Sequence, residues 1–317
     1  MAGEFRSIEI CAGGGGQALG LEHAGFNHEA LVEIEVAACD TLLYNRPRWN
    51  IVNIDIAGFD AGKYEGIDLL AGGVPCPPFS KAGKQLGAGD ERDLFPQALR
   101  LVKECRPRAV MLENVKGLLD VRFSDYRSEI IQYLEQLGYR GEWRLLNASN
   151  FGVPQLRPRA VLVAAKKDLW PHFEWPGEED FTKPCTVGAT LHDLMAANGW
   201  KKAGEWAEKA GSIAPTLVGG SKKHGGPDLG PTRARKAWAA LSVDAGGLSD
   251  EPPVPGFNGM PRLTVKMTAR IQGFPDSWKF AGRKTAAYRQ IGNAFPPPVA
   301  KALGIKIYKL LSGADNG

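Results

Sequence analysis

The stretch SIEICAGGGGQALGLEHAG, residues 7–25, sets the pattern from which the fold is predicted. Its apolar start is typical of a short β-strand, and the glycine-rich turn that follows opens into a helical pattern. Short apolar runs and helical patterns go on alternating to about residue 165. This alternation predicts an α/β protein with a doubly wound, mostly parallel sheet. Further strands are expected at 29–34, 50–56, 67–73, 108–114, 140–148 and 159–166.

The sequence changes character near residue 168, where Pro, Gly, Trp and Lys become frequent and the periodicity becomes irregular. A helical pattern resumes near the end of the chain, where Val299, Leu303 and Ile307 are in register. We therefore expect a first, α/β domain at 1–167, a smaller loop-rich domain at 168–277, and a return to the first domain at 278–317. The smaller domain would then be inserted before the C-terminal helix.

The composition excludes several classes of protein. With 44% hydrophobic residues the chain can bury a normal core, and no apolar run is long enough to cross a bilayer. The five cysteines are scattered, which favours neither a zinc site nor a disulfide framework. A reducing, cytoplasmic location is therefore expected, without a signal peptide. The net charge of +4 is compatible with a polyanionic partner but does not identify one.

Acidic residues follow the second and third expected strands, beyond the glycine turn. Glu33 ends the second strand, where a carboxylate can accept hydrogen bonds from ribose hydroxyls. Asp55 lies near the end of the third strand, where it can accept from an adenine amino group. Each acid alone is typical of a solvated strand end. With the glycine turn they predict an adenosine-containing cofactor, either NAD or S-adenosylmethionine.

Cys76 lies between prolines in GGVPCPPFSKAGKQ, residues 72–85, just after the fourth strand. A lone cysteine is usually a small buried residue that needs no such stiff frame. Glu113 in the segment ENV ends the next strand, and QLRPR at 155–159 begins another. Because ligands bind at the carboxyl edge of α/β sheets, a thiol, a carboxylic acid and two guanidinium groups are expected to converge there.

At this point the chain resembles the DNA (cytosine-5) methyltransferases along nearly its whole length. The segments that carry the resemblance occur in the order of the family: AGGGG, PCPPFS, ENVKGLL, QLRPR, RLTVKMTARIQGFPD and QIGNAFPPPVAKALG. The resemblance implies the S-adenosylmethionine-dependent methyltransferase fold. It also implies that the smaller domain is a target-recognition domain and that DNA lies in the cleft between the domains.

The resemblance implies a mechanism that explains the residue types. The Cys76 thiolate would add to C6 of cytosine, so that C5 can attack the methyl group of S-adenosylmethionine. Glu113 would hold N3 and the exocyclic amine and donate toward N3. Arg159 would grip the base carbonyl, and Arg157 would lie nearer the phosphate or the nucleophile loop. The base would have to flip out of the duplex. The sequence does not identify the group that removes H5.

The resemblance also implies which residues surround the cofactor. The expected product is S-adenosylhomocysteine, and no metal is expected. Cys11 stands where the family usually has phenylalanine, and Ile34 where it usually has an aromatic residue, which puts cofactor affinity in question more than cofactor identity. The expected cofactor-binding residues are Cys11, Ala12, Gly13, Gly15, Gly16, Glu33, Ile34, Asp55, Ile56, Pro75, Asn293 and Ala294.

Double-stranded DNA is the expected partner, and three sets of residues are candidates to contact it. Basic residues outnumber acidic ones over 201–240, a pattern that can also be an ordinary solvated face. Thr216 is expected near the phosphate of the flipped nucleotide. The candidates are Ser80, Lys81 and Gln85 in the loop at 80–93, Thr216, Lys222, Lys223 and His224 in APTLVGGSKKHGG, and Arg233 and Arg235.

Alternative functions account for less of the sequence. An NAD-dependent oxidoreductase leaves PCPPFS, ENV and QLRPR unexplained, and an inactive DNA-binding relative would not need Cys76 and Glu113. The RNA-methylating branch of the family carries a CFT signature that this chain lacks. A monomer without a membrane partner is expected. A chain of this length is typical of an enzyme that acts beside a separate restriction endonuclease, although an orphan enzyme would look the same.

Overall fold

The computed structural model describes residues 5–75, 93–220 and 226–315 of the 317. The chain divides into two compact units. Unit 1 comprises residues 1–146, 158–177 and 300–317, and unit 2 comprises residues 147–157 and 178–299. The division follows compactness alone, so the functional limits expected at residues 168 and 278 stay a prediction.

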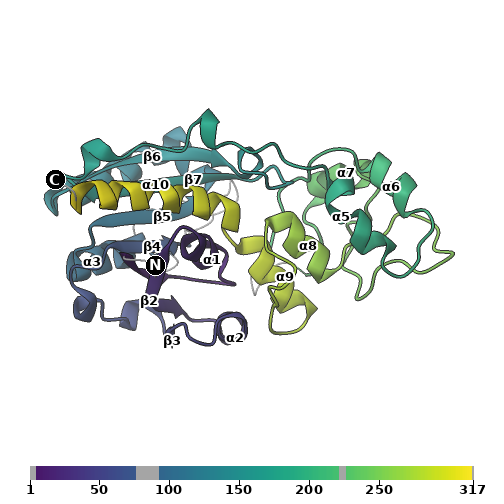
Figure 1. Ribbon diagram of the computed structural model, residues 1–317, viewed down its shortest axis with the longest axis horizontal. Coiled ribbons are helices and arrows are strands. Elements are labelled where there is room, and N and C mark those ends of the chain that lie inside the picture. Colours follow the sequence, from purple (N-terminus) through teal and green to yellow (C-terminus); the bar gives the residue numbers. More distant parts are fainter. Residues whose placement is uncertain (1–4, 76–92, 221–225, 316–317) are drawn as a thin grey trace. The chain divides into compact units, whose positions relative to one another are not determined.

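Unit 1 is an α/β structure built on a seven-stranded sheet (Figure 1). The strand order is β3-β2-β1-β4-β5-β7-β6. All pairs from β3 to β5 are parallel, and β7 pairs antiparallel with β5. This mixed, mostly parallel sheet confirms the predicted fold class. The strands are β1 (Phe5–Ile10), β2 (Phe26–Glu33), β3 (Ile51–Asn53), β4 (Leu69–Gly73), β5 (Ala109–Val115), β6 (Tyr139–Asn147) and β7 (Pro158–Lys166).

The expected strand at 50–56 is shorter than predicted. Only Ile51–Asn53 pairs with β2, because Asp55 turns the chain into a short 3₁₀-helix at Ile56–Gly58. The Asp55 side chain accepts a hydrogen bond from the Ala57 N–H at 2.8 Å, which is typical of an N-cap. The third strand therefore ends earlier, and Asp55 follows it.

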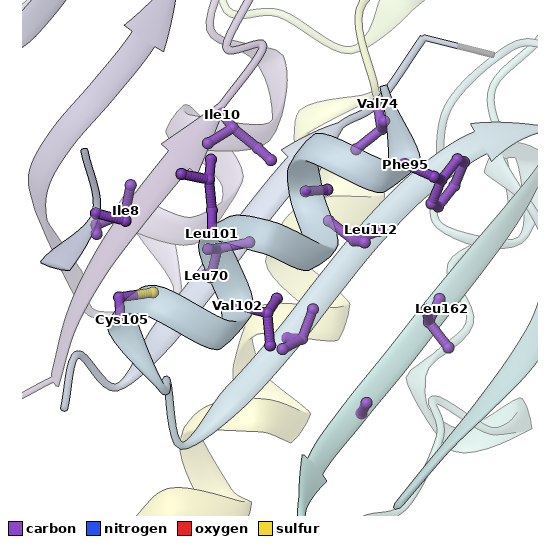
Figure 2. Close-up of a cluster of buried hydrophobic side chains, with 14 of the residues drawn as sticks. Ile8, Ile10, Leu70, Val74, Phe95, Leu101, Val102, Cys105, Leu112 and Leu162 are labelled. Atoms are coloured by element: carbon purple, nitrogen blue, oxygen red, sulfur yellow. The ribbon is translucent and has the colours of Figure 1, made fainter. Parts of the chain in front are cut away.

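Helices cover the sheet of unit 1 on both faces. On one face, α3 (Phe95–Cys105) and α4 (Ser124–Gln136) pack on a cluster of buried side chains from β1, β4, β5 and β7 (Figure 2). Leu101 and Val102 of α3 are fully buried there. The opposite face carries Phe5 and Phe26, whose rings contact Tyr308 of α10 (Pro297–Asp315). Two shorter helices complete the unit, α1 (Gly16–His23) and α2 (Val36–Asn45).

The close packing of β1 and β4 requires a glycine. A Cβ at Gly72 would lie 2.5 Å from the Ile10 Cγ1 atom and 2.7 Å from the Ile10 carbonyl oxygen. Real side chains do not approach this closely, so Gly72 lets the two strands lie together. Parallel strands that are covered on both faces are continuously apolar, and Leu69, Leu70 and Ala71 are all fully buried. The last residues of β4 lead directly to Pro75.

Unit 2 consists mainly of short helices and loops. Thr186 caps α5 by accepting from the Ala189 N–H at 3.1 Å, and Gly273 ends α8 with a φ of 93°. The large side chains Trp238 and Tyr288 are fully buried in its core. The helices are α5 (Val187–Ala196), α6 (Ala203–Lys209), α7 (Thr232–Ala240), α8 (Val265–Gln272) and α9 (Lys284–Asn293).

The helical pattern near the C-terminus forms two helices rather than one. It divides into α9, which ends at Asn293, and α10, which begins at Pro297. Three consecutive prolines, at 296–298, explain the break, because proline lacks an N–H and restricts the residue before it. The apolar register predicted for the second half is confirmed, since Val299, Leu303 and Ile307 are at most 1% exposed.

Candidate active site

The glycine turn after β1 has a backbone that few residues other than glycine adopt. Gly13 has a φ of 54° and Gly15 a φ of 83°, and the Gly15 N–H donates to the Ala12 carbonyl at 3.1 Å. Cys11 also has a positive φ of 52°, which is uncommon for a residue with a side chain. A Cβ at Gly13 would meet no atom within 4 Å. The turn therefore leaves open space beside Gly13.

Glu33 joins the end of β2 to this turn. Its Oε2 atom accepts from the Gly13 N–H at 2.7 Å, and its Oε1 atom accepts from the Glu35 N–H at 2.8 Å. Burial raises the pKa of Glu33, and these backbone donors oppose that shift. Buried Ala12 adds a backbone bond to the Val32 carbonyl at 3.1 Å. The predicted ribose acceptor is thus held in place, and each carboxylate oxygen has a further lone pair for a ligand.

The other cofactor residues expected in unit 1 differ in exposure. The Ile34 side chain is 56% exposed, and Asp55 and Pro75 are also exposed. Ile56 is 5% exposed and packs in the core cluster, so its side chain faces the protein. Because β1, β2 and β3 are parallel, their carboxyl ends meet at one edge of the sheet. Two carboxylates, an exposed apolar side chain and open space beside the turn fit a ribose and an adenine base.

The Cys11 thiol lies beside these acids and is half-buried. Burial raises the pKa of this thiol well above its usual value, and the charge of Glu33 raises it further. A thiol in such surroundings stays protonated at neutral pH and is a poor nucleophile. Cys11 is therefore suited to packing against a ligand and not to attack on a substrate.

Glu113 and Arg159 form a buried ion pair at the same edge of the sheet. The Arg159 Nε atom lies 2.7 Å from the Glu113 Oε1 atom, and their side chains are 11% and 9% exposed. They meet because β7 begins opposite the end of β5, with Arg159 paired in register with Val115. Burial lowers the pKa of Arg159, and the Glu113 carboxylate opposes that shift. Of the thiol, the acid and the two guanidinium groups predicted to converge, Glu113 and Arg159 meet at this edge.

The carboxylate of Glu113 also lies over the end of β4. Gly73 is paired with Glu113 in register, and a Cβ at Gly73 would be 3.4 Å from the Glu113 Oε2 atom. The segment that contains Cys76 begins three residues later. Cys76 itself lies outside the described residues, as do the candidate DNA contacts Ser80, Lys81 and Gln85.

Both described ends of the chain around 76–92 are fixed within unit 1. The Asn114 side chain donates to the buried Val74 carbonyl at 2.8 Å. The Leu94 N–H donates to the Pro75 carbonyl at 3.4 Å. After this segment, the Tyr126 hydroxyl donates to Asp93 at 2.5 Å. These contacts hold the backbone on either side of 76–92 against β4, β5, α3 and α4.

Arg157 has surroundings unlike those of Arg159. Its side chain is fully buried within unit 2. The Nη1 atom donates to the Leu217 carbonyl at 2.9 Å. The Nη2 atom donates to the Gly292 carbonyl at 2.7 Å and to the Ala294 carbonyl at 2.9 Å. These bonds pair both Nη atoms of the guanidinium with neutral acceptors in the interior, where no phosphate can reach it without rearrangement of the unit.

Two further cofactor residues and one DNA candidate lie beside this network in unit 2. Asn293 is exposed and donates from Nδ2 to the Gly220 carbonyl at 3.3 Å, whereas Ala294 is buried. The Thr216 hydroxyl donates to the Leu156 carbonyl, which leaves its oxygen free to accept from another donor. Thr216 directly precedes Leu217, whose carbonyl accepts from Arg157, so both residues belong to one short backbone segment.

The basic candidates of unit 2 lie mostly at its surface. Arg233 and Arg235 are exposed on α7. Arg235 forms an ion pair with Asp228 at 3.1 Å and donates to the Gly230 carbonyl at 3.0 Å. The remaining candidates Lys222, Lys223 and His224 lie outside the described residues.

A pocket of about 610 Å³ lies elsewhere in unit 2, between α5, α8 and α9. Trp278 and Phe280 line it together with charged residues, among them Lys284 and Asp250, which form an ion pair at 2.7 Å. None of the predicted site residues that the structure describes lines this pocket.

Sequence reasoning missed three buried amides that position the site. Asn114 holds the chain before Cys76, and Gln155 and Gln272 bond each other at 2.8 Å inside unit 2. All three belong to segments that carry the family resemblance, which was the available signal. Their roles were hidden because the partners are distant in sequence, 117 residues apart for Gln155 and Gln272.

Among the residues that the structure describes, no group of three or more His, Cys, Asp or Glu side chains is arranged to hold a metal ion. Over the same residues, no helix has the length and apolar character needed to span a membrane.

Comparison with known proteins finds close relatives in sequence. Residues 5–309 match the family model described as C-5 cytosine-specific DNA methylase. The chain is 56% identical over 311 residues to the Type II methyltransferase M.NgoMIV of Neisseria gonorrhoeae, covering 97% of this chain and 98% of that protein. It is 57% identical over 316 residues to the Type II methyltransferase M.NaeI of Lentzea aerocolonigenes, covering 98% of this chain and 76% of that protein.

Solved structures show the same fold. A DNA modification methyltransferase encoded within a prophage of Escherichia coli superposes with a TM-score of 0.69 at 26% identity, covering 98% of this chain and 100% of that chain. A DNMT2 variant from Spodoptera frugiperda gives a TM-score of 0.62 at 19% identity, covering 98% and 99%. At 19% identity, the likeness to the DNMT2 variant concerns the fold alone.

Proposed function

The chain belongs to the C-5 cytosine-specific DNA methylase family, and from this premise we propose that it methylates C5 of a flipped-out cytosine in a specific sequence of double-stranded DNA. The methyl donor is S-adenosylmethionine. The observation that carries this proposal is the buried Glu113–Arg159 ion pair at 2.7 Å, beside the end of the strand that leads to Cys76. An acid held by a guanidinium in a water-poor edge is suited to recognise and polarise a base.

The cofactor would be held by the turn and the strand ends of unit 1. Glu33 would accept from the ribose and Asp55 from the adenine amino group, and Ile34 would pack on the base. Asn293 and Ala294 are the further residues that would contact the cofactor. When bound, S-adenosylmethionine supplies an electrophilic methyl group.

The residues of the chain act on the cytosine. The Cys76 thiolate forms a bond to C6, and the electrons of the C5–C6 double bond make C5 nucleophilic. Glu113 donates a proton toward N3 as negative charge develops there. After C5 has gained the methyl group, N3 returns its proton to Glu113, H5 leaves as a proton to solvent, and the electrons of its bond re-form the C5–C6 double bond as the S–C6 bond breaks. The product base is 5-methylcytosine, and Cys76 returns to its thiolate state.

Arg159 orients Glu113 and binds the base at the same time. Its Nε atom is occupied by Glu113, and Nη1 donates to the Pro158 carbonyl at 3.0 Å. A guanidinium has five N–H groups, so others are available for the carbonyl oxygen of the base. This division of donors explains why an arginine and not a lysine is needed at this position.

DNA is bound chiefly through unit 2. Thr216, Arg233 and Arg235, together with Lys222, Lys223 and His224, contact the duplex, and Ser80, Lys81 and Gln85 contact it from unit 1. The Type II relatives support a role in a restriction–modification system, in which a separate endonuclease cuts unmodified DNA. The enzyme acts as a cytoplasmic monomer.

The test measures methyl transfer and the covalent bond separately. Wild-type protein should transfer tritiated methyl groups from S-adenosylmethionine to DNA, and bisulfite sequencing of DNA from an expressing host should reveal one target sequence. Cys76→Ala should abolish transfer while S-adenosylmethionine binding stays close to wild type. A duplex with 5-fluorocytosine at the target should trap wild-type protein covalently, because no proton can leave C5. An adduct that persists in Cys76→Ala would contradict the assignment of the nucleophile.

A further inference from the structure

Arg157 caps the C-terminal end of α9 from inside unit 2. Its Nη2 atom donates to the carbonyls of Gly292 and Ala294, at 2.7 Å and 2.9 Å. The last carbonyls of a helix have no partner within the helix, and the helix dipole makes this end partly negative. A fully buried guanidinium is costly unless such acceptors surround it. The position therefore stabilises both the charge and the end of the helix.

The same guanidinium, with Gln155, also binds the backbone of Leu217. The Arg157 Nη1 atom donates to the Leu217 carbonyl at 2.9 Å, and the Gln155 Oε1 atom accepts from the Leu217 N–H at 2.8 Å. Gln272 closes the network, since it accepts from Gln155 Nε2 at 2.8 Å and donates to the Ala294 carbonyl at 2.5 Å. All these side chains are buried, so water cannot replace the bonds if the segments separate.

The two backbone segments joined by Arg157 also touch each other. A Cβ at Gly292 would lie 2.4 Å from the Gly219 nitrogen, and a Cβ at Gly219 would lie 2.6 Å from the Asn293 Oδ1 atom. Asn293 in turn donates to the Gly220 carbonyl at 3.3 Å. A displacement of 216–220 therefore has to move 292–294 as well.

We infer that Arg157 is a positioning residue that holds segment 216–220 and segment 292–294 in one arrangement, so that DNA binding through the first and cofactor binding through the second are coupled. This inference rests on the proposed function, which assigns Thr216 to DNA and Asn293 to the cofactor. Coupling of this kind is reciprocal, because each ligand biases the same arrangement of the two segments. The buried network supplies the physical connection between them.

The experiment measures the affinity for S-adenosylhomocysteine by calorimetry, with and without a saturating duplex that carries the sequence found by bisulfite sequencing. For wild-type protein, DNA should tighten binding by at least about fivefold, the lower end of the usual range for coupled sites. In Arg157→Met the ratio of the two dissociation constants should fall close to one. Arg157→Lys keeps the charge but not the fork of donors, so its ratio should lie between the two.

Arg270→Met is the matched control. Arg270 lies in the same unit on α8, donates to Asp276 at 2.8 Å and to the Thr190 carbonyl at 3.0 Å, and bonds neither segment. Its ratio should equal that of wild type, which separates coupling from a general loss of stability. If Arg157→Met does not fold, as judged by circular dichroism, Arg157→Lys serves instead, and its ratio should fall below that of wild type because one ammonium group cannot bond the Leu217, Gly292 and Ala294 carbonyls together in the geometry of the guanidinium fork.

The outcomes that contradict the inference differ from those that contradict the proposed function. A ratio of one for wild-type protein overturns the coupling through Arg157, and so does an unchanged, wild-type ratio in folded Arg157→Met or, where that variant does not fold, in Arg157→Lys. Wild-type protein that binds no S-adenosylhomocysteine and methylates no DNA overturns the proposed function instead.

Discussion

Arg157 and Arg159 are two residues apart in the segment QLRPR, yet the chain passes from unit 2 to unit 1 between them. In unit 1, Arg159 faces an acid, Glu113, at a sheet edge where the pair is about a tenth exposed. In unit 2, Arg157 is fully buried and bonds neutral carbonyls at a helix end. A buried ion pair at a sheet edge leaves further guanidinium N–H groups for a ligand, whereas a guanidinium whose Nη atoms are bonded to backbone carbonyls at a helix end holds the fold together. The segment QLRPR thus contains one arginine suited to binding a substrate, Arg159, and one suited to holding backbone segments in place, Arg157.

The largest expected effect is that of Glu113→Gln, which tests the ion pair in unit 1. The amide oxygen can still accept from Arg159 Nε, so the fold should be retained, but the side chain has lost the acid that donates toward N3. General acid catalysis is worth about 10²–10⁴-fold, and the single-turnover rate of methyl transfer should fall by that amount. Far-ultraviolet circular dichroism checks the fold. A loss of less than about fivefold would remove Glu113 from the role of proton donor, given the contributions usual for such groups.

The stability of the two arginine-to-methionine variants compares the sites directly. Arg157→Met removes the side-chain donor of the buried Leu217 and Gly292 carbonyls, at about 1–3 kcal/mol each, while the Ala294 carbonyl keeps its bond from Gln272, so unfolding should become easier by about 2–6 kcal/mol. Arg159→Met should cost less, about 1–2 kcal/mol, because Glu113 can neutralise itself by binding a proton. Urea denaturation followed by tryptophan fluorescence gives both values. Equal losses in the free energy of unfolding would contradict the difference between a guanidinium that bonds backbone carbonyls and one that pairs with an acid.

Glycine-to-alanine variants extend the comparison to the backbone. In unit 2, a Cβ at Gly292 would lie 2.4 Å from the Gly219 nitrogen, so Gly292→Ala must push two segments apart and should destabilise by about 1–3 kcal/mol. In unit 1, a Cβ at Gly73 would meet Glu113 Oε2 at 3.4 Å, which is ordinary contact. Gly73→Ala should therefore change the free energy of unfolding by less than about 0.5 kcal/mol. Thermal denaturation of both variants checks this, and a reversed order would contradict the packing described here.

The smallest expected effect separates buried from exposed arginines within unit 2. Arg233 is exposed on α7, and if it neutralises one phosphate, Arg233→Ala should flatten the slope of log K against log salt concentration by about 0.9. Arg157 is buried away from phosphates, so Arg157→Met should leave the slope unchanged even if the affinity falls. DNA affinities measured across a salt series give both slopes. A flatter slope in Arg157→Met would show instead that its charge reaches the DNA backbone.

The local sequence pattern predicted most of the fold of unit 1 and the types of side chain at the candidate active site. The strand–turn–helix at 7–25 and the alternation after it depend on hydrophobic period and on glycines that take positive φ, which are properties of neighbouring residues. For the same reason Glu33, Asp55 and Glu113 could be assigned to strand ends from the sequence, and the structure finds them there or directly after. The amphipathic α3, with Leu101, Val102 and Cys105 buried, carried the same kind of signal but was missed.

What only the tertiary structure decided is which partner each buried polar group meets. The sequence presents Arg157 and Arg159 as an equivalent pair, and nothing local shows that one faces Glu113 across β5 and β7 while the other caps α9 more than 130 residues away. The amides of Asn114, Gln155 and Gln272 were likewise invisible, because a buried amide is defined by distant donors and acceptors. Hydrophobic period fixes which face of an element turns inward, but hydrogen-bond partners are fixed only when the elements pack.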